Sequence, residues 1–192
     1  MNKKLILFLL PLALFIAMTG FLFSGLFSDP TERESALIGK PIPEFQLPDL
    51  MVDGKQYNQD SLKGEAYLIN VWGTWCPTCN AELAYLTQLR KQGVKIIGLY
   101  YEQDIDPDFG ETFDINLVRA DVESKLASRG NPFALNMLDL TRSMSLDLGV
   151  TGAPETFLVD KNGIIRFHHV GEINARVWRG KFAALWQEVS GG

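Results

Sequence analysis

Hydrophobic and polar positions divide this chain into two unlike parts. The first is a run of 23 positions without a charged residue, Leu5 to Phe27, which follows Lys3 and Lys4. A helix of that length measures about 34 Å, and a bilayer core is about 30 Å thick. Because no polar face interrupts the run, we expect a transmembrane anchor over residues 1–28, with the lysines on the cytoplasmic side.

A cleaved signal peptide is the alternative interpretation of this run. Signal peptides carry an apolar stretch of about 7–15 residues that ends in a small-x-small cleavage site. The run is longer than that, and its end offers only poor pairs such as Ser24/Leu26. We therefore favour an uncleaved anchor, followed by a polar linker at 29–38 and an exported domain at 39–192.

The pattern after residue 38 predicts alternating strands and helices. Residues 39–50 contain three prolines and suit an extended or edge strand, and Asp53-Gly54 is a turn signal. Short apolar runs predict strands at 66–71, 94–101, 133–138, 156–160 and 164–169. Apolar stripes predict helices at 80–92, 119–129, 141–148 and 174–189. Asn162-Gly163 predicts a hairpin between the last two strands. This order is typical of an α/β fold, a mixed sheet with helices on both faces.

Composition and charge narrow the classes of function. All 23 acidic residues and 16 of the 18 basic residues follow residue 28, so the exported part has a formal charge of −7. This charge argues against binding to nucleic acid or to an anionic membrane surface. Two cysteines in 192 residues exclude a disulfide-rich scaffold, and 21% charged residues at a net charge of −5 exclude a typical disordered chain.

An acidic stretch at 102–118 follows the second predicted strand. Asp104, Asp106 and Asp108 alternate there, as in a calcium-binding loop. The glycine comes one position late, at Gly110, and the glutamate of such a loop is missing. We therefore interpret residues 102–114 as a solvated loop. Whether the stretch at 102–118 contacts a partner stays open.

Both cysteines lie in one motif, Trp75-Cys76-Pro77-Thr78-Cys79, directly after a predicted buried strand. Pro77 suits the first position of the following helix, which makes Cys76 its N-cap. Unpaired backbone N–H groups and the helix dipole stabilise a thiolate there and lower a thiol pKa from its free value of about 8.5. Cys79 lies on the same helical face, close enough to form a disulfide with Cys76. The motif predicts thiol–disulfide exchange, which requires no cofactor.

Other uses of two cysteines fit the sequence less well. A zinc site needs about four ligands. The two histidines, His168 and His169, are adjacent on a strand and point opposite ways, so we expect ordinary surface or half-buried residues and no metal. A haem attachment motif needs a histidine directly after Cys79, where Asn80 stands. A purely structural disulfide would close a short loop, which restrains the unfolded chain little.

Several longer segments resemble membrane-anchored proteins of the thioredoxin fold. The resemblance is closest to the CcmG/DsbE family, the thiol–disulfide reductases of cytochrome c maturation. The segments that carry it lie at 35–45 (SALIGKPIPEF), 70–82 (NVWGTWCPTCNAE), 130–135 (GNPFAL), 146–167 (LDLGVTGAPETFLVDKNGIIRF) and 177–178 (VW). They span almost the whole of 35–189, and the segments at 130–135 and 146–167 are more specific than the Cys-x-x-Cys motif.

The resemblance implies a location, a substrate and an electron source. Such proteins cross the bacterial inner membrane once and hold their soluble domain in the periplasm. They reduce the Cys-x-x-Cys-His disulfide of apocytochrome c, or a disulfide of another maturation protein, before haem attaches. A DsbD/CcdA-type membrane transporter supplies their electrons.

The resemblance also implies roles for single residues. Cys76 would be the attacking thiolate and Cys79 the resolving thiol. Pro154 would be a cis-proline that faces the disulfide, and the backbone of Ala153 would pair with the substrate chain. The residues that would shape the site around them are Trp75, Pro77 and Thr78.

Two tryptophans near the motif are expected to differ in role. Trp75, directly before Cys76, would shield the disulfide, with simple packing as the alternative. Trp72 is expected in the core.

The chain departs from thioredoxin at one position. Thioredoxin has a buried aspartate six residues before its first cysteine, where this chain has Asn70. Proton uptake by Cys79 then needs another group or water, and the candidates are Glu82 on the active-site helix and Glu155 beside Pro154. For Glu82 a solvated helix face is an equally good interpretation. Glu155 is favoured because residues beside the proline face the site.

The residues alone do not fix the direction of electron flow. The same dithiol would act as an oxidant at a high reduction potential, or would serve other periplasmic substrates. The remaining alternative is a scaffold of a maturation complex in which the cysteines are secondary.

Overall fold

The structure is a computed structural model that describes most of the chain. The described residues are 3–25, 36–103 and 113–191. Most of the linker expected at 29–38 lies outside them. So do Asp104, Asp106, Asp108 and Gly110, the residues on which the calcium-loop interpretation depended.

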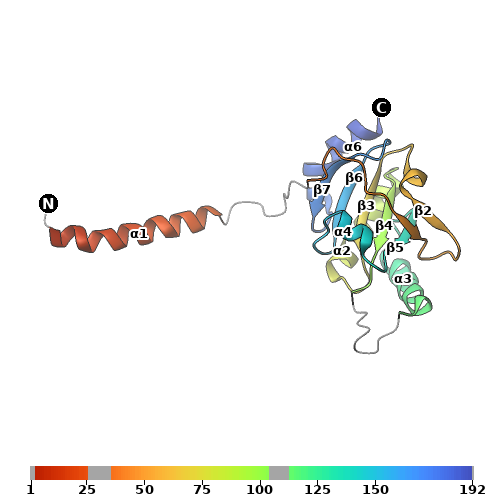
Figure 1. The fold of residues 1–192 in the computed structure, drawn as a ribbon, viewed down its shortest axis with the longest axis horizontal. Coiled ribbons are helices and arrows are strands. Elements are labelled where there is room, and N and C mark those ends of the chain that lie inside the picture. The colour runs from red at the N-terminus through yellow and green to blue at the C-terminus, as the bar shows by residue number, and fades with distance from the viewer. Residues whose placement is uncertain (1–2, 26–35, 104–112, 192) are drawn as a thin grey trace. The chain divides into compact units, whose positions relative to one another are not determined.

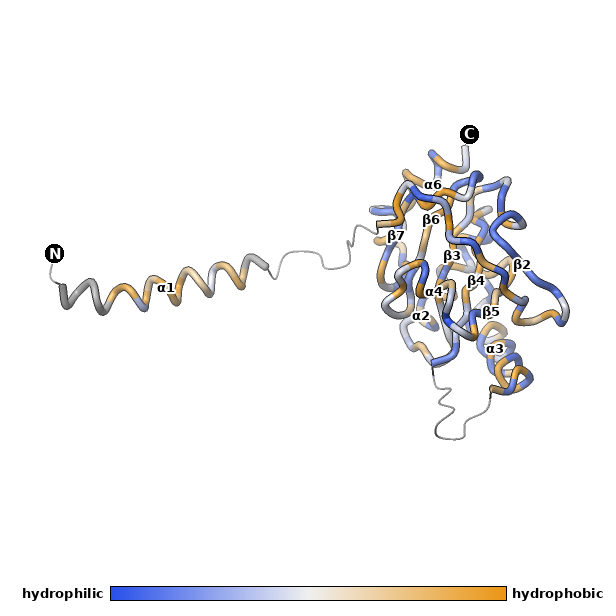
Figure 2. The backbone as a smooth tube through the Cα atoms, viewed as in Figure 1, coloured by the Kyte–Doolittle hydropathy of each residue, from blue (hydrophilic) through white to orange (hydrophobic). Residues whose placement is uncertain are grey.

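The chain divides into two compact units, Met1–Glu32 and Arg33–Gly192, and each is described by itself. The first contains α1, Lys3–Gly25, which continues through Pro11. Its side chains from 9 to 23 are exposed, and Figure 2 colours much of this stretch as hydrophobic. Among the described residues, no helix has both the length and the hydropathy that a membrane span requires.

A five-stranded sheet forms the centre of the second unit (Figure 1). Its strands are β3 (Tyr67–Trp72), β4 (Ile96–Tyr100), β5 (Leu135–Leu138), β6 (Glu155–Val159) and β7 (Ile165–Val170). They stand in the order β5-β4-β3-β6-β7. β3, β4 and β5 are parallel, whereas β6 and β7 pair antiparallel with their neighbours. The expected mixed sheet is confirmed, and each strand lies where a short apolar run predicts one.

Helices cover both faces of this sheet, as expected. The longer ones are α2 (Pro77–Lys91) and α3 (Ile115–Arg129), and the short α4 is Ser143–Asp147. Leu68 and Trp72 of β3 pack in one core with α2 and α3, whereas Ile69 and Val71 pack in a second core with Met144 of α4. The alternation of side chains along β3 therefore separates the two faces. Trp72 is fully buried, which confirms its expected place in the core.

The proline-rich segment at 39–50 is largely extended and forms a small hairpin with the residues that follow it. β1 (Gln46–Pro48) and β2 (Gln56–Asn58) pair antiparallel, and the 3-10 helix η1 (Gln59–Leu62) follows. Asp49 holds the connection, because it accepts a 2.7 Å hydrogen bond from the Tyr57 hydroxyl and bonds the Met51 N–H at 2.8 Å. The hairpin covers the second face of the sheet through Leu47 and Tyr57.

The helix expected at 119–129 begins four residues earlier, at Ile115. Asp114 caps it by accepting a 2.9 Å hydrogen bond from the Asn116 N–H. Ile115 and Val118 of this first turn pack against the first core, but the acidic residues directly before them favour a loop. Residues 115–118, the last four of the acidic stretch at 102–118, are therefore helical.

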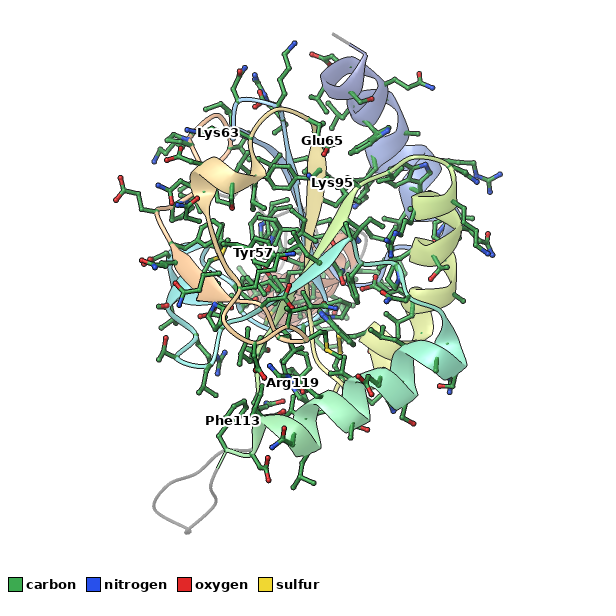
Figure 3. All side chains as sticks on the ribbon, turned by 90° about the vertical axis from the view of Figure 1, so that its right-hand side faces the viewer. Tyr57, Lys63, Glu65, Lys95, Phe113 and Arg119 are labelled. Carbon is green, nitrogen blue, oxygen red and sulfur yellow. A yellow bond between two sulfur atoms is a disulfide. The ribbon has the colours of Figure 1, made fainter. Side chains whose placement is uncertain are left out.

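Two ion pairs tie loops to this framework, and Figure 3 labels residues of both. Arg119 of α3 pairs with Asp53 at 2.6 Å and donates to the Leu50 carbonyl at 2.6 Å, which fixes α3 against the β1–β2 connection. Lys95, directly before β4, pairs with Glu65 before β3 at 2.6 Å.

The C-terminal stripe at 174–189 is helical, but it is not one uniform helix. Its parts are α5 (Ala175–Val177), η3 (Trp178–Phe182) and α6 (Ala183–Ser190). η3 is π-helical, and the Ala183 N–H bonds the Trp178 carbonyl five residues earlier. The rings of Trp178 and Phe182 stack at 5.7 Å and fill the first core, so the stripe does face the sheet.

Candidate active site

The two cysteines form a disulfide where β3 leads into α2. Cys76 is the N-cap of α2, and its sulfur accepts a 3.1 Å hydrogen bond from the Cys79 N–H. Pro77 is the first helical residue, so the sequence prediction of this cap is confirmed. Cys76 is 3% exposed and Cys79 is fully buried, whereas Pro77 and Thr78 between them are exposed. Of the two cysteines, Cys76 is therefore the more accessible.

Trp75 is held beside the disulfide by a polar contact as well as by packing. Its indole N–H donates a 2.9 Å hydrogen bond to the Tyr101 carbonyl, and the two rings lie 5.0 Å apart. The indole folds back over Gly73 so closely that a Cβ at Gly73 would overlap it. Trp75 and Ala153 each pack against both cores, so both lie at the end of the sheet where its two faces meet.

The segment before β6 lies against the disulfide from the other side. The Ala153–Pro154 peptide bond is cis, as the resemblance implied. The sulfur of Cys76 lies 3.4 Å from the Ala153 carbonyl oxygen. The Gly171 N–H bonds the Pro154 carbonyl at 2.9 Å, which extends the pairing of β6 and β7 up to the proline. The structure thus brings Cys76, Ala153 and Pro154 together, although 77 positions separate Cys76 from Ala153.

Glu82 lies one turn after Cys79 on the buried face of α2. It is 2% exposed, so the interpretation as a solvated helix face is wrong. Oε1 accepts a 2.8 Å hydrogen bond from the Asn70 side chain, and Oε2 accepts one of 2.6 Å from the Ile173 N–H. Burial raises the pKa of Glu82 to about 7, although both hydrogen bonds oppose the shift. A carboxyl with this pKa can take up or release a proton near neutral pH.

Asn70 connects Glu82 to the neighbouring strand. Its amide also donates to the Thr156 hydroxyl at 3.1 Å, and the two residues are paired across β3 and β6. Asn70 is therefore not a simple loss of the thioredoxin aspartate, because it orients a carboxylate that comes from α2 instead. The sequence gives no sign of this role for Thr156, because only strand pairing places it beside Asn70.

Glu155 points to the opposite face of the sheet from Glu82. Side chains alternate along β6, and the neighbouring Thr156 shares the face of Asn70 and Glu82. Oε1 of Glu155 accepts hydrogen bonds from the N–H and hydroxyl of Thr151, each 2.8 Å, and from the Gly152 N–H at 3.0 Å. The Glu155 carboxylate thus binds the loop that precedes Pro154.

The second oxygen of Glu155 contacts His168, a residue for which the sequence predicts no role in the site. Oε2 lies 2.7 Å from Nε2 of His168 on β7. Burial alone would raise the pKa of Glu155, but the hydrogen bonds from His168 and Thr151 outweigh it and hold the pKa below its ordinary value.

The expectation that His168 and His169 are surface or half-buried residues is wrong. His168 is 6% exposed and His169 is 3% exposed. The ring of His168 stacks on Phe157 at 4.1 Å on one face of the sheet, and the ring of His169 meets Phe182 edge-on at 5.8 Å on the other. The two histidines do point opposite ways, but both faces of β7 are covered. In the part of the chain that the structure describes, no three metal-ligating side chains converge.

Comparison with known sequences gives close matches over the whole chain. A family profile for Redoxin matches residues 37–179. The thiol:disulfide interchange protein DsbE of Vibrio cholerae is 44% identical and aligns with 98% of this chain and 97% of its own length. DsbE of Escherichia coli K12 is also 44% identical, over 99% of this chain and 97% of its own.

Comparison with solved structures supports the fold. A thiol:disulfide interchange protein of the thioredoxin family from Chlorobium tepidum superposes with a TM-score of 0.55 at 23% identity. The match covers 78% of this chain and 94% of that one, so the thioredoxin-like fold implied by the resemblance is confirmed. A disulfide at the head of α2, set in this fold, can exchange with thiols of another protein. Identity of 44% over nearly the full length shows the family: this chain belongs to the DsbE family of thiol:disulfide interchange proteins and is a thiol–disulfide oxidoreductase.

Proposed function

We propose that this protein is a periplasmic reductant that opens the Cys-x-x-Cys-His disulfide of apocytochrome c, or a disulfide of a maturation partner, before haem attaches. The observation that carries the proposal is the position of the Cys76 sulfur, 3.4 Å from the Ala153 carbonyl beside cis-Pro154. A substrate strand that pairs with the Ala153 backbone would bring its own disulfide to this sulfur. The family supports the class of reaction, and the resemblance supports the substrate.

The proposed reaction begins with the reduced dithiol. The Cys76 thiolate attacks one sulfur of the substrate disulfide, and the other substrate sulfur leaves as a thiolate. Cys79 then attacks Cys76 in this mixed disulfide, and the second substrate thiol is released. Two electrons pass to the substrate, and the protein keeps the Cys76–Cys79 disulfide that the structure contains. Both sulfur atoms come from the chain, so the exchange uses no further cofactor.

Glu82 accepts the proton that Cys79 loses in the second step. Its carboxyl is buried on the face of α2 that carries Cys79, and the Asn70 amide and the Ile173 N–H hold it in place. A pKa of about 7 suits such a transfer near neutral pH. Glu155 is not given this role, because its carboxylate lies on the opposite face of the sheet from Glu82 and its hydrogen bonds hold its pKa below the ordinary value.

The proposal also places the protein in the inner membrane, held there by its N-terminal segment. The uncharged run from Leu5 to Phe27, after two lysines, supports a signal anchor with the domain in the periplasm. A DsbD/CcdA-type membrane transporter would return the disulfide to the dithiol there. Full-length protein should then sediment with membranes after an alkaline carbonate wash, and a chain that replaces residues 1–28 with a cleavable export signal should not. An unanchored full-length chain would contradict the anchor and leave the exchange chemistry intact.

Trapping of the mixed disulfide tests the substrate. A Cys79→Ser variant cannot resolve the complex, so it should accumulate adducts through Cys76 that dithiothreitol releases. Identification of apocytochrome c or a maturation protein among them would support the proposal. The matched control is a Cys76→Ser variant, which should trap nothing. Adducts with unrelated periplasmic proteins alone would favour a general thioredoxin-like reductase or oxidase, and a reduction potential well above or below about −200 mV would separate those two.

A double variant tests the scaffold alternative. Cys76→Ala with Cys79→Ala removes all exchange chemistry and leaves the surface almost unchanged. We expect loss of haem attachment to c-type cytochromes in cells that depend on this variant. Normal haem attachment would show that the cysteines are secondary and that the protein acts as a scaffold.

A further inference from the structure

The segment Thr151–Ala153, which the proposed function uses to dock substrate, is held by a single buried carboxylate. Oε1 of Glu155 binds the Thr151 N–H and hydroxyl at 2.8 Å each, and the Gly152 N–H at 3.0 Å. The segment itself is accessible, because Thr151 is exposed and Gly152 and Ala153 are half-buried. Glu155 is 1% exposed, so a buried group orders an exposed piece of backbone.

The carboxylate is in turn held from behind by His168. Nε2 of His168 lies 2.7 Å from Oε2 of Glu155, and the imidazole is stacked on Phe157 with an angle of 4° between the rings. A carboxylate can only accept here, so the proton of this contact belongs to Nε2 of His168. The stack fixes the plane of the imidazole, and the hydrogen bond fixes the carboxylate.

Order in this segment matters because of Gly152. A glycine samples more backbone conformations than any other residue, and nothing lies within 4 Å of the position where its Cβ would be. Without the bond to Glu155, the Gly152 backbone would have to be ordered when a substrate strand binds. A segment that is ordered beforehand avoids that entropy loss and binds more tightly.

We propose that Glu155 and His168 are positioning residues that hold Thr151–Ala153 in the conformation whose backbone receives a substrate strand. This inference rests on the proposed docking at Ala153. It assigns a role to the His168 side chain and replaces the proton-transfer role that the sequence suggested for Glu155. Neither side chain touches the reacting sulfur atoms, so both act through the backbone. Their loss should affect docking of a peptide and not the chemistry at Cys76.

Two substrates separate docking from chemistry. An oxidised Cys-x-x-Cys-His peptide can pair with the Ala153 backbone, whereas cystamine, a small disulfide without a peptide backbone, cannot. With dithiothreitol regenerating the dithiol, Glu155→Ala should raise KM for the peptide about tenfold and leave kcat nearly unchanged. Its rate with cystamine should stay within about twofold of wild type. Glu155→Gln keeps an oxygen that can accept from Thr151 and Gly152, so it should restore most of the peptide KM.

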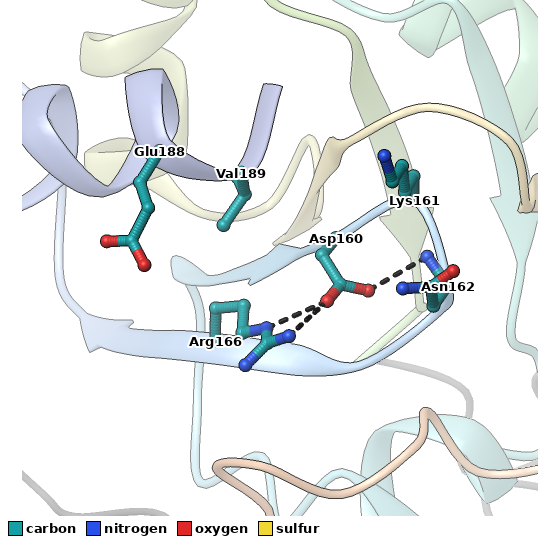
Figure 4. Close-up of a pocket in the computed structure, with 6 residues that line it drawn as sticks. All are labelled: Asp160, Lys161, Asn162, Arg166, Glu188 and Val189. Atoms are coloured by element: carbon teal, nitrogen blue, oxygen red, sulfur yellow. Dashed lines mark hydrogen bonds and ion pairs between the residues drawn. The ribbon is translucent and has the colours of Figure 1, made fainter. Parts of the chain in front are cut away.

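The chain offers a matched control at the other end of β6. Asp160 directly follows this strand, and its carboxylate also holds a turn and a basic side chain (Figure 4). Oδ1 accepts from the Asn162 N–H at 2.9 Å, and Oδ2 accepts from Nε of Arg166 at 2.8 Å. Asp160→Ala should therefore lower the melting temperature, as Glu155→Ala should, but it should leave the peptide KM within about twofold of wild type.

A second variant keeps the inference testable if Glu155→Ala does not fold. His168→Phe preserves a ring that can stack on Phe157 and removes only the bond to Glu155, so the peptide KM should rise about threefold. An unchanged peptide KM in folded Glu155→Ala or His168→Phe protein would overturn the inference. So would an equal loss of rate with cystamine. Failure of the wild-type protein to prefer the peptide over cystamine would overturn the docking at Ala153 itself, and the inference with it.

Discussion

The side-chain amide of Asn70 donates a 2.8 Å hydrogen bond to Oε1 of Glu82, and this contact joins β3 to α2 behind the disulfide. Both oxygens of the carboxyl are occupied, because the Ile173 N–H donates to Oε2 at 2.6 Å. Burial nevertheless raises the pKa of Glu82 to about 7. An ionisable group of this kind should leave a mark on stability and on rate, each with a defined dependence on pH.

Stability of the oxidised protein should fall as pH rises from about 4.5 to about 7. Between the ordinary pKa of 4.5 and the folded value of about 7, the folded protein binds the Glu82 proton more tightly than the unfolded chain does. The unfolded state then holds fewer protons, so rising pH favours unfolding, by a total of roughly 3 kcal/mol for this group. Denaturant unfolding of wild type and Glu82→Gln at several pH values measures it.

The test is the difference in pH dependence between wild type and Glu82→Gln. Glu82→Gln should lose this part of the pH dependence whatever its absolute stability, because its side chain does not titrate. Glu188→Gln on the exposed face of α6 is the matched control and should follow wild type. Parallel pH curves for wild type and Glu82→Gln would show that Glu82 titrates alike in both states.

Resolution of the mixed disulfide should also depend on Glu82. In wild type its rate should rise with pH and level off above about 7, as the carboxylate becomes available to accept the Cys79 proton. Glu82→Gln should lower the rate at neutral pH by about a hundredfold and move the rise toward the pKa of the thiol itself. Stopped-flow single turnover gives both profiles. An unshifted profile in the variant would assign the proton to water.

Gly73→Ala should displace Trp75 without touching either cysteine. A methyl group at Gly73 would overlap the Trp75 indole, so the 2.9 Å bond to the Tyr101 carbonyl cannot persist. We expect a loss of about 1–3 kcal/mol in the free energy of unfolding, the usual cost of an overpacked site. Tryptophan fluorescence and denaturant unfolding measure the two effects.

Gly180→Ala is the control for this substitution. Nothing lies within 4 Å of a Cβ at Gly180, which is helical, so alanine there should be neutral or stabilise by about 0.5–1 kcal/mol. A Gly73→Ala protein as stable as wild type, with unchanged fluorescence, would mean that the indole is not fixed by its contact with Tyr101.

The two thiols should differ in reactivity once the disulfide is reduced. Cys76 sits at the N-cap of α2, where its sulfur accepts from the Cys79 N–H at 3.1 Å, and Cys79 is fully buried. The helix N-terminus stabilises a thiolate only at Cys76. Iodoacetamide should therefore alkylate Cys76 in the Cys79→Ser variant at least about tenfold faster than Cys79 in the Cys76→Ser variant. Equal rates, followed by mass spectrometry at pH 7, would contradict this asymmetry.

The sequence by itself determined the strands, most helix limits and the redox pair. Each depends on local physics: apolar runs that must be buried, Pro77 at a helix start, and two cysteines one turn apart. Where local signals fail, the prediction failed with them. The start of α3 depends on the Asp114 cap, and the π-helical turn at Trp178 has no signature in an apolar stripe.

Only the tertiary structure decided on which face of the sheet each acidic residue lies and what it contacts. Glu82 and Glu155 look alike in sequence, since each lies within a turn or a step of a site residue. The pairing of β3 with β6 places Asn70 and Thr156 on the face of α2, so Glu82 lies on the side of the cysteines and Glu155 on the other. His168 contacts Glu155 because β7 pairs with β6, and both side chains lie on the same buried face of the sheet. Contacts of this kind join residues far apart in the chain, and the hydrophobic pattern carries no information about which distant strand lies alongside.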